Sequence, residues 1–352
     1  MKDGNVILTY KHRLLYCDGQ SKLFYYKGKL MFFDHDVLIN KCKIVGFLGR
    51  CSIFSRLLRS EPLTVFRLND GNFLIAFKGK ILNYNPLNGK INCEHLFCDG
   101  MNYPLYFCSR DINGRQELYY GEYYQDSKNK CVHVFKRTDG VWKSVYHFEK
   151  NSIKHIHNII WDSNRDSFYI FTGDEDNESG IWQSDSDFKT VSPILIGSQQ
   201  YRSCFGFVKD DYLFYATDTP LSNNYVYKID LNKKEPPILI ANISGPCIYG
   251  TKVGDNFYIS TSVEPDPRKS KVKYYLTRKP GPGLNDSYSR IYLIQSECVL
   301  EIAKFKKDYL PMALFEFGNI LFPLNQTNDL HCVLQSLKPK HGATITIKNG
   351  GA

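Results

Sequence analysis

Long apolar runs are absent from this 352-residue chain. No stretch reaches the roughly 18 uninterrupted apolar residues that a membrane-spanning helix needs, so we expect no transmembrane segment. The first ten residues also lack the charged region, apolar core and small-residue cleavage site of a secretory signal. Only 4 residues are methionine, whereas 25 are tyrosine and 23 are phenylalanine. This aromatic excess favours pleated β-strands over helices.

Regular cysteine spacing is missing too. The 11 cysteines are odd in number and form no CxxC pair, which argues against a disulfide framework and against a zinc site. Cysteines without such partners behave as small apolar side chains. We therefore predict reduced, buried thiols and, in the absence of a secretory signal, a cytoplasmic location.

Basic residues are numerous but not clustered. Lys and Arg number 45 against 36 Asp and Glu, a formal net charge of +9. Nucleic-acid binding needs a basic stripe with stacking aromatics, so we expect no nucleic-acid partner, whereas an anionic ligand is compatible with the charge. A Pro/Gly/Lys-rich stretch over 265–289 is predicted to be a loop insertion, and its basic part near Lys269 to Lys279 either contacts a partner or is solvated.

Helical periodicity is nearly absent as well. The best helical segment runs from Phe47 to Arg59, before Glu61-Pro62 ends it. The apolar residues that could share one face of this helix are Phe47, Ile53, Phe54, Leu57 and Leu58. Elsewhere, short apolar runs are separated by turn signals such as Asn69-Asp70-Gly71. Many short strands at even spacing predict a sandwich, a barrel or a propeller.

An internal repeat decides among these architectures. A strand of alternating aromatic and aliphatic residues that ends on a polar residue recurs at intervals of ~40–60 residues, which is typical of propeller blades. The polar ends are Lys78, Glu122, Asp174, Asp218, Glu264 and Asn325. We therefore predict an all-β fold in which residues 1–352 form one β-propeller domain of six blades. The N-terminal strands ILTY, LLYCD and KLFYYKG are expected to pair with the last blade and close the ring. Seven blades, with residues 1–40 as a blade of their own, is the alternative.

The candidate reacting residues follow from this repeat. Four consecutive polar ends are acidic, and equivalent strand ends should meet at one end of the central channel. The segment Lys154–Asn158 places His155 and His157 on one face of an inner strand, where imidazoles can bind a metal, relay a proton or hold sugar hydroxyls. We predict the reacting set Glu122, His155, His157 and Asp174. A divalent metal ion is one possible cofactor, with His155 and His157 as its candidate ligands.

A second group of residues is predicted to bind substrate. Arg suits bidentate capture of a carboxylate, although an inter-blade salt bridge is the alternative role of Arg202. The predicted substrate-binding residues are Gln199, Arg202, Asp218, Asn224 and Glu264. Acids, amides and Tyr together suit a glycan, so we predict a carbohydrate-active enzyme, a glycoside hydrolase or a polysaccharide lyase, acting on an anionic or highly hydroxylated glycan. A non-catalytic propeller that binds a glycan or a protein is the alternative.

Two short stretches resemble the Asp-box hairpin of sialidase-like (BNR-repeat) propellers. Lys136–Trp142 keeps the Asp, Gly and Trp of that motif, and Ser184–Val191 keeps its Ser and Thr. The order of motifs over 115–265 is similar to that of bacterial members. The resemblance implies a propeller and glycan chemistry. It does not imply sialidase activity, because of the three carboxylate-binding arginines of sialidases only Arg202, with Arg56 or Arg59, has a counterpart.

Overall fold

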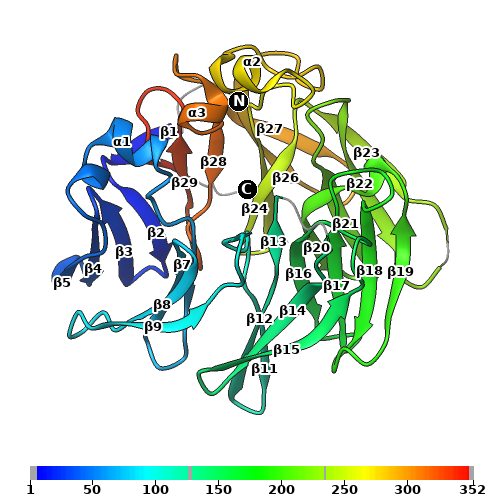
Figure 1. Ribbon diagram of the computed structural model, residues 1–352, viewed down its shortest axis with the longest axis horizontal. Helices are drawn as coiled ribbons and strands as arrows, with labels where there is room; N and C mark the ends of the chain where they lie inside the picture. Colours follow the sequence, from blue (N-terminus) through cyan, green and yellow to red (C-terminus); the bar gives the residue numbers. More distant parts are fainter. Residues whose placement is uncertain (1–5, 126–128, 234, 349–352) are drawn as a thin grey trace. The chain divides into compact units, whose positions relative to one another are not determined.

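The computed structural model describes residues 6–125, 129–233 and 235–348, and antiparallel β-sheet dominates it (Figure 1). Seven of its sheets have four strands each. The first three are β2 (Arg13–Cys17), β3 (Ser21–Tyr26), β4 (Lys29–Asp34) and β5 (Val37–Lys43); β6 (Thr64–Arg67), β7 (Phe73–Phe77), β8 (Lys80–Tyr84) and β9 (Ile91–Leu96); and β11 (Cys108–Ile112), β12 (Arg115–Gly121), β14 (Val132–Thr138) and β15 (Val141–Phe148). The next three are β16 (Ile156–Asp162), β17 (Ser167–Thr172), β18 (Gly180–Asp185) and β19 (Val191–Ile196); β20 (Ser203–Lys209), β21 (Tyr212–Thr217), β22 (Asn224–Asp230) and β23 (Ile238–Ile243); and β24 (Cys247–Val253), β25 (Asn256–Thr261), β26 (Tyr288–Ile294) and β27 (Val299–Lys306).

The seventh sheet combines the two ends of the chain. Strand β1 (Val6–Tyr10) pairs antiparallel with β30 (Ala343–Ile347), which continues through β29 (Leu330–Gln335) to β28 (Asn319–Leu321). A smaller sheet has two strands, β10 (Met101–Asn102) and β13 (Tyr123–Tyr124). The helices are short: α1 (Ser52–Leu57), α2 (Lys271–Leu276), α3 (Met312–Phe315) and the 3-10 helices over Leu48–Arg50 and Gln199–Tyr201. Among the described residues, no helix is long and apolar enough to cross a membrane.

Seven four-stranded antiparallel sheets make this a seven-bladed β-propeller, so the prediction of six blades is wrong. Of the three N-terminal strands expected to join the last blade, only β1 does so, while β2 and β3 belong to a sheet of their own. The repeat count left that blade out because its strands were assigned to ring closure, although Lys27 follows β3 as Lys78 follows β7. It also misplaced Asn325, which follows the first strand of its sheet rather than the second.

The apolar strands of the repeat are buried because they lie inside their sheets. All five residues of β7 and all six of β17 are buried, whereas the last strands of the same sheets, β9 and β19, are partly exposed along their length. Inner strands that are covered on both faces read as continuous apolar runs. All eleven cysteines are free, and five of them are buried.

The chain divides into two compact units. One comprises the described residues of Met1–Glu61, Asp218–Lys228 and Pro236–Ala352, and the other those of Pro62–Thr217 and Ile229–Glu235. They are called here the terminal unit and the central unit. The predicted single domain stays a prediction. So does the predicted loop insertion over 265–289, a segment that contains helix α2.

Candidate functional site

Three of the predicted reacting residues, His155, His157 and Asp174, come together in the central unit. His155 directly precedes β16, and the pairing of β16 with β17 shifts its register between Ile156 and Asn158. This bulge accommodates His157 as an extra residue, and bulges often occur beside functional sites because they re-aim a side chain. Asp174 follows the end of β17, the strand that pairs with β16. Strand pairing therefore brings the imidazoles and the carboxylate to the same sheet end.

The two histidines point their Nε2 atoms at each other. His155 Nδ1 lies 2.6 Å from the carbonyl oxygen of Tyr124, and His157 Nδ1 lies 3.0 Å from that of Ser203. A carbonyl only accepts hydrogen bonds, so each Nδ1 carries a proton. The two Nε2 atoms are 2.9 Å apart, and His155 Nε2 also lies 3.1 Å from the Gly173 carbonyl oxygen, which would accept a proton carried by that nitrogen. In two neutral rings the facing lone pairs would repel, so the contact requires either a proton on His155 Nε2 or a metal ion between the rings.

Asp174 supplies the negative charge of this cluster. Its Oδ1 lies 3.4 Å from His155 Nε2 and 3.5 Å from His157 Nε2. Burial alone would raise the pKa of Asp174, but the positive charges of His155 and Arg202 and its hydrogen bonds hold that pKa well below the usual range. The carboxylate is therefore ionised throughout the neutral range. It is also the accessible member, with about a quarter of its side chain exposed (26%), whereas His155 and His157 are buried.

Arg202 and Gln199 hold the loop that carries Asp174. Arg202 Nη2 lies 3.0 Å from Asp174 Oδ1, and its Nη1 donates to the Asp174 carbonyl at 3.1 Å. Gln199 Nε2 donates to the same carbonyl at 2.7 Å. Since Arg202 precedes β20, this ion pair joins two neighbouring sheets. The salt bridge foreseen as an alternative for Arg202 is present, and its partner is the candidate acid.

A divalent metal ion fits the donor set of this cluster. Bonds of about 2.0–2.2 Å to nitrogen and oxygen place neighbouring ligand atoms about 2.8–3.6 Å apart, for ligand angles between octahedral and tetrahedral. The separations among the two Nε2 atoms and Asp174 Oδ1 are 2.9, 3.4 and 3.5 Å. Metal-bound histidines usually donate their other ring N–H to a carbonyl or carboxylate, which fixes the tautomer. His155 and His157 both do so here, so the three residues suit a metal ion.

Sequence reasoning missed Tyr123, which completes the surroundings of the cluster. Its ring stacks on His155 with centroids 4.1 Å apart and an interplanar angle of 10°. The side chain is partly exposed, unlike the histidine that it covers. The run Gly121-Glu122-Tyr123-Tyr124 held the signal, because side chains alternate along an extended segment. The prediction that Glu122 faces the central channel implied that the next residue, Tyr123, faces away from the channel.

The Glu122 carboxylate belongs to a neighbouring group. It accepts hydrogen bonds from the Tyr124 hydroxyl at 2.8 Å, from the His133 backbone N–H at 2.9 Å and from His133 Nδ1 at 2.8 Å. Its backbone still touches the cluster, because the Glu122 carbonyl accepts the N–H of Ile156 at 2.9 Å. Glu122 is therefore beside His155 along the chain but directs its side chain elsewhere.

Asp218, Asn224 and Glu264 lie in the terminal unit. Asn224 uses its side-chain amide to hold the turn before it, accepting from the Thr219 N–H at 2.9 Å and donating to the Thr219 carbonyl at 2.8 Å. Glu264 accepts a short hydrogen bond from the Ser262 hydroxyl. Asp218 is buried. The structure thus brings Gln199 and Arg202 to the histidine cluster, while the other three predicted substrate-binding residues belong to a different unit.

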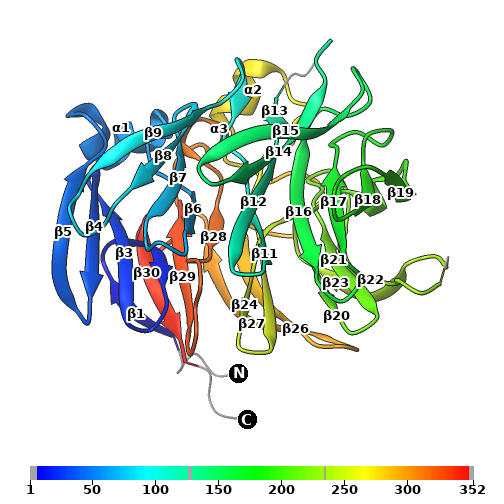
Figure 2. The same cartoon turned by 90° about the horizontal axis from the view of Figure 1, so that it is seen from below.

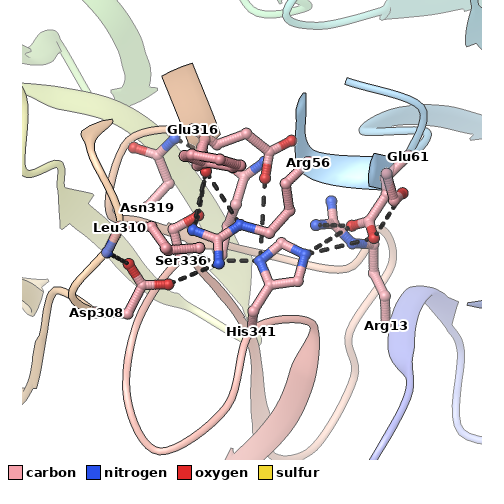
Figure 3. A network of polar contacts seen from close by, with 12 residues as sticks. Arg13, Arg56, Glu61, Asp308, Leu310, Glu316, Asn319, Ser336 and His341 are labelled. Carbon is pink, nitrogen blue, oxygen red and sulfur yellow. Dashed lines mark hydrogen bonds and ion pairs between the residues drawn. The ribbon is translucent and has the colours of Figure 1, made fainter. Parts of the chain in front are cut away.

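The terminal unit contains a buried polar network of its own (Figure 3). Arg13 Nη2 pairs with Glu61 Oε2 at 2.5 Å. His341 Nδ1 accepts the backbone N–H of Ser336 at 3.0 Å, so its Nε2 carries the proton and lies 3.4 Å from Glu61. Burial raises the pKa of Glu61, but the charge of Arg13 and the His341 contact outweigh this and lower it to about 2. Glu61 is therefore the ionised centre of the network.

The same network ties helix α1 to the C-terminal part of the chain. Arg56 donates to the Phe315 carbonyl at 3.0 and 2.9 Å and to the Ser336 hydroxyl at 2.8 Å, and it pairs with Asp308 at 2.8 Å. Glu316 has a positive φ of 74° and a buried Oε2 without a hydrogen-bond partner. Burial, followed by the negative charge of Glu61, raises the pKa of Glu316. Arg56 and its partners are enclosed and paired with one another, which indicates a structural role.

No protein-family model and no curated protein matches the chain. Among solved structures, it is similar to an oligogalacturonate lyase from Vibrio parahaemolyticus, with a TM-score of 0.60 and 12% identity over 98% of this chain and 94% of that one. An oligogalacturonate lyase in complex with manganese gives a TM-score of 0.59 and 10% identity over 98% and 90% of the two chains. A prolyl endopeptidase gives 0.54 and 10% over 93% of this chain and 46% of that one. At these identities the comparisons show the propeller fold alone and assign no family. The propeller implied by the Asp-box resemblance is therefore confirmed, whereas its sialidase-like family stays a prediction.

Proposed function

We propose that this protein is a metal-assisted lyase that cleaves an anionic, uronate-containing oligosaccharide at the cluster of His155, His157 and Asp174. The observation that carries the proposal is the convergence of two imidazole Nε2 atoms and a carboxylate oxygen within 3.5 Å, with both Nδ1 atoms anchored on backbone carbonyls. The existence of oligogalacturonate lyases with the same fold supports the proposal, because it shows that a propeller of this kind can carry such a reaction.

The charge of the cluster favours an anionic substrate. Arg202 and Asp174 cancel each other, and the histidines are neutral when they bind metal, so a bound divalent ion leaves a net positive site. Such an ion would be held by His155, His157 and Asp174, and it would supply the Lewis-acid charge that stabilises a uronate carboxylate. A hydrolase acting on a neutral sugar would gain nothing from this charge.

Tyr123 is the proton-transfer group that the arrangement offers. In an elimination, a base takes the proton from the carbon next to the carboxyl group, and the electrons of that C–H bond form a carbon–carbon double bond. The bond between the adjacent carbon and the glycosidic oxygen breaks, and this oxygen takes a proton from an acid or from water. Tyrosine can serve as such a base when it is held beside the reacting centre. Tyr123 is partly exposed and stacks on His155. Arg202 keeps Asp174 ionised and in place.

The test of this function is an assay on uronate oligosaccharides with added Mn²⁺. A lyase produces an unsaturated uronate that absorbs in the ultraviolet, whereas a hydrolase produces new reducing ends without that absorbance. We expect Tyr123→Phe to lower turnover about 10²–10⁴-fold, the usual contribution of a general acid or base, while leaving Mn²⁺ binding unchanged. Tyr103→Phe, another partly exposed tyrosine of the central unit, is the matched control. Release of reducing ends alone would contradict the lyase assignment.

A non-catalytic glycan-binding propeller is the second candidate, and one observation favours it. The ion pair between Arg202 and Asp174 ties the accessible carboxylate into the scaffold, and both histidines are almost wholly enclosed. Such a protein would bind uronate oligosaccharides without cleaving them, and calorimetry would show the same affinity with and without Mn²⁺. Metal-independent binding without turnover would therefore decide for the scaffold.

A further inference from the structure

Helix α1 exposes its apolar side chains and buries two of its polar ones. A surface helix normally turns its apolar stripe toward the core. In α1 the buried residues are Ser55 and Arg56, whereas the large apolar residues in and around the helix are between 40% and 82% exposed. These exposed residues are Phe47, Ile53, Phe54, Leu57 and Leu58. Arg56 holds the helix in this orientation through its bonds to Phe315, Ser336 and Asp308.

Helix α2 adds a second set of exposed apolar residues, embedded in positive charge. Val272, Tyr275 and Leu276 are exposed large hydrophobic side chains of this helix. The basic residues around them are Arg268, Lys269, Lys271, Lys273, Arg278 and Lys279. The sequence has no acidic residue between Asp266 and Asp286, and Asp266 itself is paired with Arg268 at 2.9 Å. Exposed apolar side chains and unopposed lysines thus occupy one segment.

Helix α3 connects the two sets within the terminal unit. Arg59, next to α1, donates to the Ala313 carbonyl of α3 at 3.1 Å. The backbone N–H of Met312 in α3 donates to the Thr277 carbonyl, next to α2, at 3.3 Å. In two perpendicular views the three helices lie along one margin of this unit (Figures 1 and 2). We call the exposed residues of 47–59 and 268–279 the helical face.

We propose that the helical face docks on an anionic lipid bilayer. Contiguous exposed apolar side chains mark interaction surfaces, and helices with apolar side chains flanked by Lys and Arg bind at the headgroup boundary of acidic membranes. A bilayer accepts protruding side chains without a complementary shape. A protein partner fits less well, because protein interfaces are depleted in Lys, whereas four lysines belong to 268–279. The segment from Phe47 to Ser60 contains no acidic residue, so no carboxylate of this segment would repel the anionic lipid.

The test is co-sedimentation of the full chain with vesicles of phosphatidylcholine, with and without phosphatidylserine. We expect binding to the anionic vesicles only, weakened by salt because exposed charges are screened. Phe47→Ser/Phe54→Ser/Leu57→Ser should weaken it about tenfold through lost apolar insertion, and Lys271→Glu/Lys273→Glu should weaken it about as much through lost attraction.

The matched control is Leu87→Ser/Leu96→Ser/Val141→Ser, which removes three apolar residues of the central unit that are each more than half exposed. It should bind vesicles as the unaltered protein does. Because all substituted residues are exposed, the melting temperature of each variant should stay unchanged. Failure of the unaltered protein to bind anionic vesicles, or equal losses in the control, would overturn the proposal. So would apolar variants that change only self-association or capture of a protein.

Discussion

At the scale of single residues, the protein places ionisable groups where their charge is fixed by neighbours. Asp174 and Glu61 are both partly buried carboxylates whose pKa falls because cationic partners outweigh the cost of burial. They differ in what surrounds them. Asp174 keeps part of its side chain accessible and faces the Nε2 atoms of two histidines, whereas Glu61 is enclosed between Arg13 and His341. The surroundings of Asp174 therefore suit ligand binding, whereas those of Glu61 suit stabilisation of the fold.

Asp174→Asn separates the metal-binding role of Asp174 from its place in the fold. The amide keeps the size of the side chain but removes the charge, so we expect Mn²⁺ affinity to fall by about 10–100-fold. Isothermal titration calorimetry of the full chain measures this. Asp187→Asn, an exposed aspartate of the same unit, is the control and should bind as before. Unchanged Mn²⁺ affinity in Asp174→Asn would remove this residue from the ligand set.

Glu61→Gln tests the network of the terminal unit through its pH dependence. A carboxylate whose folded-state pKa is lowered stabilises the fold above its unfolded pKa and loses this contribution as the pH falls through the folded value. For Glu61 the window runs from the ordinary value of 4.5 down to about 2. We expect the variant to lose about 3 kcal/mol of stability at neutral pH, since it leaves Arg13 buried and unpaired, and to approach the unaltered protein near pH 2.

Thermal unfolding at several pH values gives this comparison. Asp36→Asn is the control, because Asp36 pairs with Lys22 on the surface, where its side chain is 81% exposed. Exposed ion pairs contribute little to the free energy of unfolding, so Asp36→Asn should leave the stability nearly unchanged at every pH. If the stability lost in Glu61→Gln were the same at low pH, the loss would come from altered packing rather than from the missing charge, which would contradict this account.

At the scale of elements, the end of β12 positions the start of β16. Gly121 closes β12, and a Cβ atom built there would lie 2.3 Å from the Ile156 side chain. The backbones join directly beyond this point, through the bond from Ile156 to Glu122 and the bridge between Tyr123 and His155. A glycine inside a strand often marks such a close approach. The placement of His155 therefore depends on a residue that carries no chemistry.

Gly121→Ala should disturb both stability and the site. The added methyl group has no room, so we expect a loss of about 1–3 kcal/mol, typical of overpacking, together with weaker Mn²⁺ binding because the start of β16 must move. Gly46→Ala is the control, since nothing lies within 4 Å of its built Cβ. Chemical denaturation and calorimetry measure the two effects. Weaker metal binding without any loss of stability would contradict this account.

At the scale of the whole molecule, the alternation of short apolar strands and turns was enough to predict a propeller, and local spacing was enough to find the His155–His157 pair. The blade count failed because β3, which Lys27 follows as Lys78 follows β7, was assigned to ring closure, and because Asn325 was chosen in place of Gln335 at the end of β29. The Glu122 carboxylate contacts Tyr124 and His133 rather than the histidine pair, and the sequence does not show which face of an extended segment meets its neighbours. The network of Arg13, Glu61 and His341 could not be predicted at all, since tertiary packing alone brings these distant residues together.

The central claim is that His155, His157 and Asp174 hold a divalent metal ion. The most direct measurement is an anomalous difference map from crystals of the full chain grown with Mn²⁺. The account predicts a peak within about 2.3 Å of both Nε2 atoms and of an Asp174 carboxylate oxygen. A map with no peak there and with the Nε2 atoms still in hydrogen-bond contact would contradict it. So would a peak confined to the other, surface group of Cys131, His147 and Glu149.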